Sequence, residues 1–194
     1  MATRLVNSFA PQEDVMASVD ATLEHVQARE LRYRLAILGP NPLAVVRYAG
    51  GWIFDRVLAG WEVWVAVAEC DDPRPVRILG AEVLDLESCL NSNPDARPQT
   101  LAVDTALFGS YSRIRNGLLD SLDTAEFEVA LWGENWPAEL DCRVGSPVQY
   151  RMSSAARAFK ERAYSAALTS DPVDAVETFR VGSPSLAADL LPSG

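Results

Sequence analysis

The sequence predicts an α+β fold, in which an antiparallel sheet carries a central apolar helix and further helices packed on it. Two observations lead to this prediction. Segments with the alternating pattern of strands come in adjacent groups and do not alternate with helices, an order typical of antiparallel sheets. The segment 42–59 is apolar almost all round, which places a helix in the interior. With 194 residues, of which 48% are hydrophobic, the chain is long enough to bury such a core.

The domain organisation follows from composition. One α+β domain is predicted over residues 15–182, preceded by a flexible N-terminus at 1–14 and followed by a C-terminal turn and tail at 183–194. The terminal segments lack the apolar density that an ordered core requires. The N-terminal residues also lack the apolar centre of a signal peptide, and charges interrupt the apolar stretch 42–68, so no membrane-spanning helix is expected.

The first element is predicted to be a helix over 18–38. Apolar side chains recur along it with a period near 3.6 residues, namely Val19, Leu23, Val26, Leu31, Leu35 and Leu38. Gly39 and Pro40 would end this helix, because neither residue continues a helix well.

A second helix is predicted over 42–59. Asn41 is a suitable N-cap residue, and Pro42 suits the first helical position. Gly50 and Gly51 in the middle cost about 1 kcal/mol each relative to alanine. A close helix crossing or a bend is therefore expected at this glycine pair.

Two strands are predicted next, at 61–69 and 76–86. The first alternates valines on one face with other side chains on the opposite face. The connection 71–75 contains two aspartates and two prolines, which is typical of a turn. The two strands are therefore expected to pair as an antiparallel hairpin over 61–86.

The remaining elements follow from the same rules of periodicity and capping. A loop is expected at 88–100, and Asp104 would cap the helix after it. The later elements expected are a helix at 105–122, a strand at 127–133, short extended segments at 138–144 and 147–152, a helix from 153 or 154 to 168, a short helix at 171–181 and a turn at 185–191.

Net charge and cysteine content narrow the function classes. The net charge of −10 disfavours nucleic-acid binding, because phosphate recognition depends on basic side chains. The three cysteines, Cys70, Cys89 and Cys142, form no CxxC pair, and His25 is the only histidine. Neither a zinc site nor a disulfide framework is therefore expected, and a cytoplasmic location is predicted. No metal and no other cofactor is predicted.

No catalytic residue is predicted either. A cysteine nucleophile would need a base, and His25 lies beside Glu24, away from the apolar stripe of its helix. The motifs GxSxG, GxxxxGK[ST] and GxGxxG are absent. The turn at 39–42 exposes a helix N-terminus that could hold an anion, but every helix start shares this property.

A binding surface is predicted around the second helix and the hairpin. Three tryptophans lie within thirteen residues there, and exposed tryptophan near arginine is typical of interfaces. The candidate binding residues are Arg47, Trp52, Asp55, Arg56, Trp61 and Trp64. The alternative is that helices cover both faces of the sheet, so that the tryptophans are core and the charges are paired locally.

Three functions are compatible with these features. The leading prediction is a non-enzymatic cytoplasmic interaction or regulatory protein, whose aromatic and arginine surface around helix 42–59 and hairpin 61–86 binds a protein partner or another copy of the chain. The first alternative is a winged-helix-like DNA-binding regulator, because two helices followed by a hairpin is the order of that module. The second is an enzyme of unknown class that works without histidine or cysteine catalysis.

Overall fold

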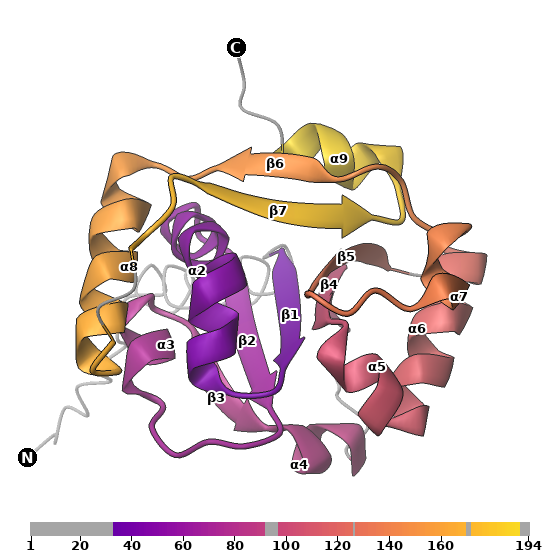
Figure 1. The fold of residues 1–194 in the computed structure, drawn as a ribbon, viewed down its shortest axis with the longest axis horizontal. Coiled ribbons are helices and arrows are strands. Elements are labelled where there is room, and N and C mark those ends of the chain that lie inside the picture. Colours follow the sequence, from indigo (N-terminus) through magenta and orange to yellow (C-terminus); the bar gives the residue numbers. More distant parts are fainter. Residues whose placement is uncertain (1–32, 92–96, 126, 170–171, 191–194) are drawn as a thin grey trace, which may run out of the picture. The chain divides into compact units, whose positions relative to one another are not determined.

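The structure of the chain is a computed structural model that describes residues 33–91, 97–125, 127–169 and 172–190. Within these residues the strands form a seven-stranded sheet in the order β3-β2-β1-β4-β5-β7-β6 (Figure 1). The strands are β1 (Arg34–Gly39), β2 (Glu62–Val67), β3 (Glu82–Asp85), β4 (Thr100–Asp104), β5 (Glu128–Trp132), β6 (Val148–Arg151) and β7 (Val176–Val181).

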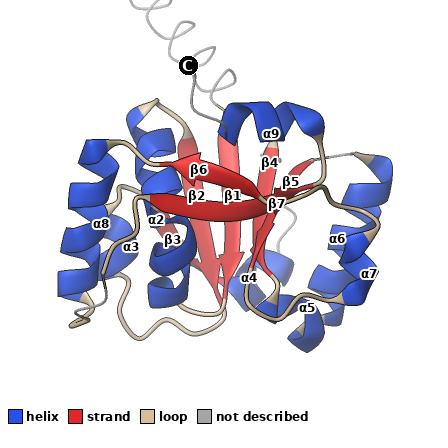
Figure 2. Cartoon of the chain, turned by 45° about the horizontal axis from the view of Figure 1, so that its top comes forward, coloured by secondary structure: helices blue, strands red, loops and turns tan. Residues whose placement is uncertain are grey.

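Helices cover both faces of this sheet. The helices are α2 (Pro42–Leu58), α3 (Arg74–Ile78), α4 (Leu86–Asn91), α5 (Ala106–Ser110), α6 (Ser112–Thr124), α7 (Ala138–Asp141), α8 (Ser154–Ala166) and α9 (Pro184–Leu190). Helices α2, α3 and α8 lie on one side of the parallel strands, and α4 to α7 lie on the other (Figure 2). Among the described residues, no helix is both long and apolar enough to cross a bilayer.

Five of the seven strands run parallel. β1 pairs with β2 and β4, β2 pairs with β3, and β4 pairs with β5, all in parallel. β7 is antiparallel to β5, and β6 is antiparallel to β7. The predicted antiparallel α+β sheet is therefore wrong, and the fold is α/β with a mostly parallel mixed sheet. The short helix α3 lies across the predicted turn 71–75 and the start of the predicted strand 76–86, and α4 lies across the end of that strand and the predicted loop 88–100. The crossovers that parallel strands need were therefore missed.

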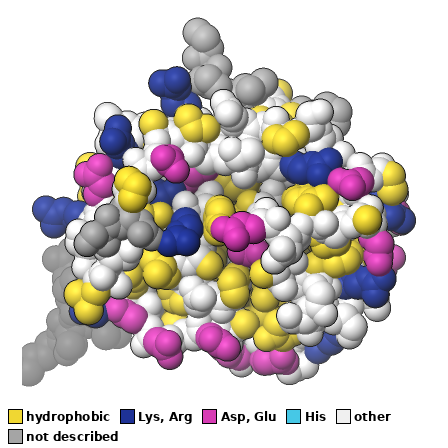
Figure 3. Space-filling view, viewed as in Figure 1, with side chains coloured by type: hydrophobic (Ala, Val, Ile, Leu, Met, Phe, Trp, Pro, Cys, Tyr) yellow, Lys and Arg dark blue, Asp and Glu magenta, His cyan; other side chains and the backbone are white. Residues whose placement is uncertain are grey.

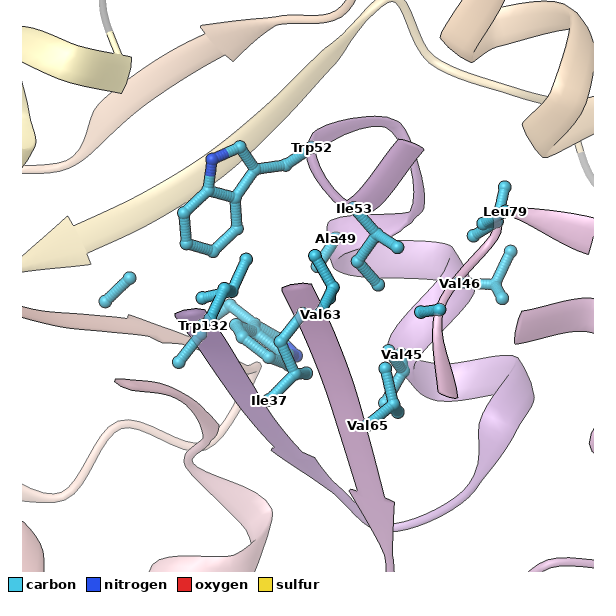
Figure 4. Packing of buried hydrophobic residues seen from close by; sticks show 14 of the residues in the cluster. Ile37, Val45, Val46, Ala49, Trp52, Ile53, Val63, Val65, Leu79 and Trp132 are labelled. Carbon is cyan, nitrogen blue, oxygen red and sulfur yellow. The ribbon is translucent and has the colours of Figure 1, made fainter. Parts of the chain in front are cut away.

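The hydrophobic core has two parts, one on each face of the sheet. On one face, Trp52 and Ile53 of α2 pack with Ile37 of β1 and Val65 of β2 (Figure 4). On the other face, side chains of α5 and α6 pack against β4 and β5. Because both faces are covered, the strands are apolar on both sides, which is typical of parallel sheets.

The predicted first helix is wrong in its last part. Residues 34–39 form β1, in which Leu35 and Ile37 are fully buried. Buried side chains therefore recur at every second residue, as in a strand, and not with the helical period of 3.6 residues. Residues 18–32 of that helix lie outside the described residues. The predicted flexible N-terminus at 1–14 and the end of the tail lie outside them too, so the domain boundaries stay a prediction.

The predicted hairpin 61–86 is also wrong. β2 forms where a strand was expected, but β3 runs parallel to it, with Trp64 opposite Glu82. Parallel pairing requires the chain to return along the sheet before β3 begins, and α3 belongs to that connection.

Two further elements differ from the prediction. The segment predicted as a helix at 171–181 contains strand β7, because Glu177, Phe179 and Val181 alternate toward the core. A short helix, α7, forms where an extended segment was expected. The predicted helix at 105–122 is confirmed but divided at Tyr111, whose backbone is extended.

The caps of the two long helices confirm the sequence analysis. Oδ1 of Asn41 accepts a hydrogen bond from the amide of Ala44 at 2.9 Å, and α2 begins at Pro42. Ser153 caps α8, since its Oγ accepts from the amide of Ala156 at 3.0 Å. Each cap satisfies a helix amide that would otherwise lack a partner.

Candidate active site

The carboxyl ends of β1 and β4 open into a crevice. β1 continues into α2 on one face of the sheet, whereas β4 continues into α5 on the other face. Neighbouring parallel strands whose connections leave toward opposite faces create the place where α/β proteins commonly bind ligands. The segments that border this place are 39–41, 104–106 and 133–135.

Three adjoining cavities occupy this edge of the sheet. The first, of about 330 Å³, lies in the crevice and is lined by Asn41, Asp104 and Glu134 among others. The second, of about 590 Å³, extends toward α8 and β7 and shares Arg47 and Tyr48 with the first. The third, of about 810 Å³, extends toward α5 and α7. Glu134 borders all three cavities, and each of them has a volume in the range of small-molecule sites.

Asp104 is the buried carboxyl group of this crevice. The amide of Ala106 donates to its Oδ1 at 2.9 Å, and the indole N–H of Trp132 donates to its Oδ2 at 3.0 Å. Burial raises the pKa of Asp104 above its ordinary value, although the two hydrogen bonds oppose this shift. A buried carboxyl group that borders a cavity, is held in one orientation by hydrogen bonds and has a raised pKa is a candidate general acid or base.

Two polar side chains that contact each other, Tyr48 and Glu134, border one side of the crevice. The hydroxyl of Tyr48 on α2 donates to Oε1 of Glu134, in the loop after β5, at 2.8 Å. Burial and the adjacent carboxylate raise the pKa of Tyr48, so its hydroxyl keeps its proton at neutral pH. This hydrogen bond therefore links α2 to the loop after β5, and the tyrosine side chain stays uncharged.

The 590 Å³ cavity has a buried ion pair in its wall. Lys160, the only lysine of the chain, donates from Nζ to Oε1 of Glu177 and to the carbonyl oxygen of Arg47, both at 2.6 Å. The Glu177 carboxylate also accepts from the amides of Gly51 and Trp52. In a regular helix those amides would bond to carbonyls four residues earlier. The ion pair is therefore hydrogen-bonded to the backbone in the middle of α2, where Figure 1 shows the helix bending.

The structure separates the predicted binding residues. Arg47 lines the crevice. Trp52 is fully buried, and its ring centre lies 5.1 Å from that of Phe179. Asp55 accepts hydrogen bonds from the amide and the hydroxyl of Ser153 at the start of α8. Of these three predicted residues, only Arg47 borders a space that a ligand could enter.

The other three predicted residues lie away from the crevice. The guanidinium of Arg56 lies 4.6 Å from the ring centre of Trp61, which also stacks on Tyr33. Trp61 precedes β2, so it lies at the opposite edge of the sheet. Trp64 borders a separate apolar pocket of about 470 Å³ that also involves β3 and α4. The six residues therefore do not form one surface, and binding of a protein partner or of a second copy stays a prediction.

The sequence analysis missed Asp104, Tyr48 and Glu134 as site residues. Asp104 was predicted only as a helix cap, whereas the structure has Thr105 at the N-cap of α5, and Asp104, one residue earlier, accepts a hydrogen bond from the amide of Ala106. A usable signal was present: residues 101–103 form a short apolar run, and a polar residue directly after a buried parallel strand lies at its carboxyl edge. The predicted loop ended at residue 100 and the next helix began at 105, so residues 101–103 were assigned to no element and β4 was missed.

Comparisons with known proteins support the fold. No family model and no curated protein matches the chain in sequence. The A40926 pseudoaglycone deacetylase is 15% identical with a TM-score of 0.53, and the match covers 77% of this chain and 96% of that one. The N,N′-diacetylchitobiose deacetylase from Pyrococcus horikoshii is 12% identical with a TM-score of 0.51, covering 96% and 98%. The zinc-inhibited form of teicoplanin deacetylase is 13% identical with a TM-score of 0.51, covering 76% and 97%.

These likenesses establish an α/β fold shared with deacetylases and correct the functional predictions. The prediction of a non-enzymatic interaction or regulatory protein is contradicted, because the three solved structures named above, which share this fold, are deacetylases. The winged-helix alternative fails because its hairpin does not exist. Acidic and basic side chains are also interspersed over the face seen in Figure 3, where nucleic-acid binding would favour a basic patch.

The described residues do not fit a zinc centre. Among them, no three histidine, cysteine, aspartate or glutamate side chains are grouped closely enough to hold a metal ion. His25, the only histidine of the chain, lies outside the described part. In the crevice, Asn41 uses its Oδ1 as a helix cap, and Asp104 is held by an amide and an indole. The described residues of the crevice therefore offer only the chemistry of their own side chains.

Proposed function

We propose that the chain is a hydrolase that cleaves the amide bond of a small, uncharged, hydroxylated molecule, such as an N-acetylated sugar. The observation that carries this proposal is the position of Asp104, buried and raised in pKa at the carboxyl end of β4. The names of the structures with this fold, a pseudoaglycone deacetylase and a diacetylchitobiose deacetylase, support the choice of reaction.

Asp104 acts as the general base in this proposal. In its ionised form it takes a proton from a water molecule, whose oxygen attacks the acyl carbon. The proton then passes to the amide nitrogen as the carbon–nitrogen bond breaks, leaving a carboxylic acid and an amine. Arg47 borders the same crevice, where its positive charge would stabilise the negative charge that develops on the acyl oxygen.

The charges of the crevice support an uncharged substrate. Asp104 and Glu134 would repel an anion, while Arg47 disfavours a cation. We also place the enzyme in the cytoplasm. Cys70, Cys89 and Cys142 are all free thiols, which supports a reducing location.

The test is incubation of the full chain with N-acetylglucosamine and with N,N′-diacetylchitobiose, with released acetate followed by proton NMR. Asp104→Asn should lower the rate by about 10²- to 10⁴-fold. Asp120→Asn, at an exposed aspartate on α6, should leave the rate unchanged. Absence of acetate release by the wild-type chain, or an Asp104→Asn variant as fast as the wild type, would overturn the proposal.

A further inference from the structure

The two halves of helix α2 have different surroundings. The first half follows β1 directly and brings Arg47 and Tyr48 to the crevice. The second half is fixed to β6 and to the start of α8, because Asp55 accepts hydrogen bonds from the hydroxyl of Tyr150 at 2.6 Å and from the amide and hydroxyl of Ser153. The angle between the halves therefore determines where Arg47 and Tyr48 lie relative to the other walls of the crevice.

The ion pair of Lys160 and Glu177 lies where the two halves of α2 meet. A regular helix would join the carbonyl oxygen of Arg47 to the amide of Gly51, four residues later. In α2 that carbonyl oxygen accepts from Nζ of Lys160 at 2.6 Å, and that amide donates to Oε1 of Glu177 at 2.7 Å. The amide of Trp52 donates to the other carboxylate oxygen at 2.9 Å. The ion pair thus binds the donor and the acceptor of one helical hydrogen bond, and side chains that enter the bonding pattern in this way bend helices.

The glycine pair of α2 lets these side chains come close to the helix backbone. A Cβ atom at Gly50 would lie 3.4 Å from Cδ of Lys160, and one at Gly51 would lie 2.7 Å from Cβ of Met152. Because the glycines have no side chains, α8 and β7 can approach the middle of α2. Both charged side chains are almost fully buried, so water does not compete for their bonds to the helix. Hydrogen bonds to charged groups are also about twice as strong as those between neutral groups.

Without the two charges, α2 has another arrangement at hand. The carbonyl oxygen of Arg47 and the amide of Gly51 can then bond to each other, as they would in a straight helix. The bonds of Asp55 to β6 and α8 keep the second half in place, so a straighter helix turns the first half away from its present direction. The ion pair therefore controls the direction of the part of α2 that borders the crevice.

We infer that Lys160 and Glu177 are positioning residues of the candidate active site. Their ion pair holds α2 bent, and the bend places Arg47 and Tyr48 in the wall of the crevice that contains Asp104. Neither positioning residue touches the substrate, since both act through the backbone of α2. The consequence for catalysis rests on the proposed function, in which the guanidinium of Arg47 stabilises the acyl oxygen. The placement of Tyr48 can be tested without it.

The test uses a double variant that removes both charges and keeps the fold. Replacement of a buried ion pair by apolar residues of similar volume is often neutral for stability, because no unpaired charge remains. Lys160→Met/Glu177→Met should therefore unfold in urea at a midpoint close to that of the wild type, and Lys160→Leu/Glu177→Leu is the second variant with the same purpose. The matched control is Arg157→Met/Glu161→Met, which removes an exposed ion pair on α8. If neither apolar pair folds, the ion pair serves folding itself and the inference is overturned.

The first measurement reports the position of Tyr48 by NMR. The Cζ resonances of the five tyrosines are observed in ¹³C-labelled protein at neutral pH, and that of Tyr48 is assigned from Tyr48→Phe. In the wild type, Glu134→Gln should shift this resonance, because the Tyr48 hydroxyl donates to the Glu134 carboxylate at 2.8 Å. In the apolar double variant the same substitution should leave the resonance unmoved, whereas the control should respond like the wild type. An equal response in all three backgrounds would overturn the inference.

The second measurement separates positioning from stability. A folded double variant as stable as the wild type should still release acetate with a kcat/KM lowered by about 10²-fold, because a small displacement of a catalytic group is costly. A purely structural pair would leave the rate of such a variant unchanged, and that result would also overturn the inference. If the wild-type chain releases no acetate, the proposed hydrolysis fails, and the NMR comparison alone decides whether Lys160 and Glu177 position Tyr48.

Discussion

Nζ of Lys160 lies 2.6 Å from Oε1 of Glu177, and the two side chains are only 3% and 1% exposed. Lys160 belongs to α8 and Glu177 to β7, yet both also bond to the backbone of α2. A buried charge is tolerated only when it is paired and hydrogen-bonded, and here the pair and its backbone partners come from α8, β7 and α2. The pair therefore ties three elements together beside the cavity that Arg47 and Tyr48 border.

Replacement of Lys160 by an uncharged residue should strongly lower the stability of the fold. Lys160→Met leaves the Glu177 carboxylate buried without its counter-charge, and we expect the free energy of unfolding in urea to fall by about 3–5 kcal/mol. Arg157→Met, which removes an exposed ion pair with Glu161 on the same helix, should cost no more than about 0.5 kcal/mol. Equal losses in the two variants would show that the buried pair has no special importance.

The deficit of Lys160→Met should also depend on pH. Burial already raises the pKa of Glu177, and the lysine opposes this shift. Without the lysine, the folded-state pKa lies further above the unfolded value of about 4.3. A carboxyl group raised in this way destabilises the fold increasingly as pH rises through the folded-state pKa, and this loss disappears below the unfolded one. Urea midpoints of the variant should therefore approach those of the wild type as the pH is lowered, and a deficit that grows toward acid pH would contradict this account.

The rate of acetate release should follow the ionisation of Asp104. Because the base must be ionised, kcat/KM should rise with pH through the pKa of Asp104, which burial holds above the ordinary value of about 3.9. Tyr48→Phe removes the hydrogen bond to Glu134 but leaves Asp104 in place, so the acid limb of its pH profile should stay where it is in the wild type. An acid limb at the ordinary aspartate pKa would argue against Asp104 as the base.

The glycine pair of α2 offers a matched comparison. A Cβ atom at Gly51 would lie 2.7 Å from Cβ of Met152, whereas one at Gly50 would meet its nearest atoms at 3.3 to 3.4 Å. Alanine favours a helix over glycine by about 1 kcal/mol at either position. Gly50→Ala should therefore change stability little, while Gly51→Ala should lower it by about 1–3 kcal/mol through overpacking. Thermal unfolding of the two variants side by side measures the difference, and a Gly51→Ala variant as stable as Gly50→Ala would refute it.

Gly133 should be required for the stability of the fold. With φ of +141° and Thr105 Oγ1 in the position of a Cβ, Gly133→Ala strains the backbone and displaces Thr105. We expect a loss of about 1–3 kcal/mol in the free energy of unfolding. Gly117→Ala on the exposed side of α6, where a Cβ meets no atom within 4 Å, should keep or slightly raise stability. Calorimetry of both variants measures the difference, and equal stability of the two variants would contradict this account.

Local signals in the sequence predicted several elements correctly. The N-cap Asn41 and the following Pro42 defined the start of α2, and Ser153 defined that of α8, because capping depends on residues within one turn. The strands β2 and β5 followed from apolar alternation. A close helix crossing or a bend was expected at the glycine pair, and there Glu177 accepts from the amide of Gly51, while a Cβ at Gly51 would lie 2.7 Å from Cβ of Met152; these contacts could not be foreseen from α2 alone.

The sequence by itself therefore determined which segments are apolar and where the helices α2 and α8 begin. Only the tertiary structure decided the directions of the strands, because side chains point alternately to the two faces of a sheet in parallel and antiparallel pairs alike, and β1 and β7 became strands through pairing with distant partners. The candidate site depends on those directions: Tyr48 and Glu134 are 86 residues apart, and Asp104 and Trp132 are 28 apart. They meet because the carboxyl ends of parallel strands lie at one edge of the sheet, a relationship that no local pattern encodes.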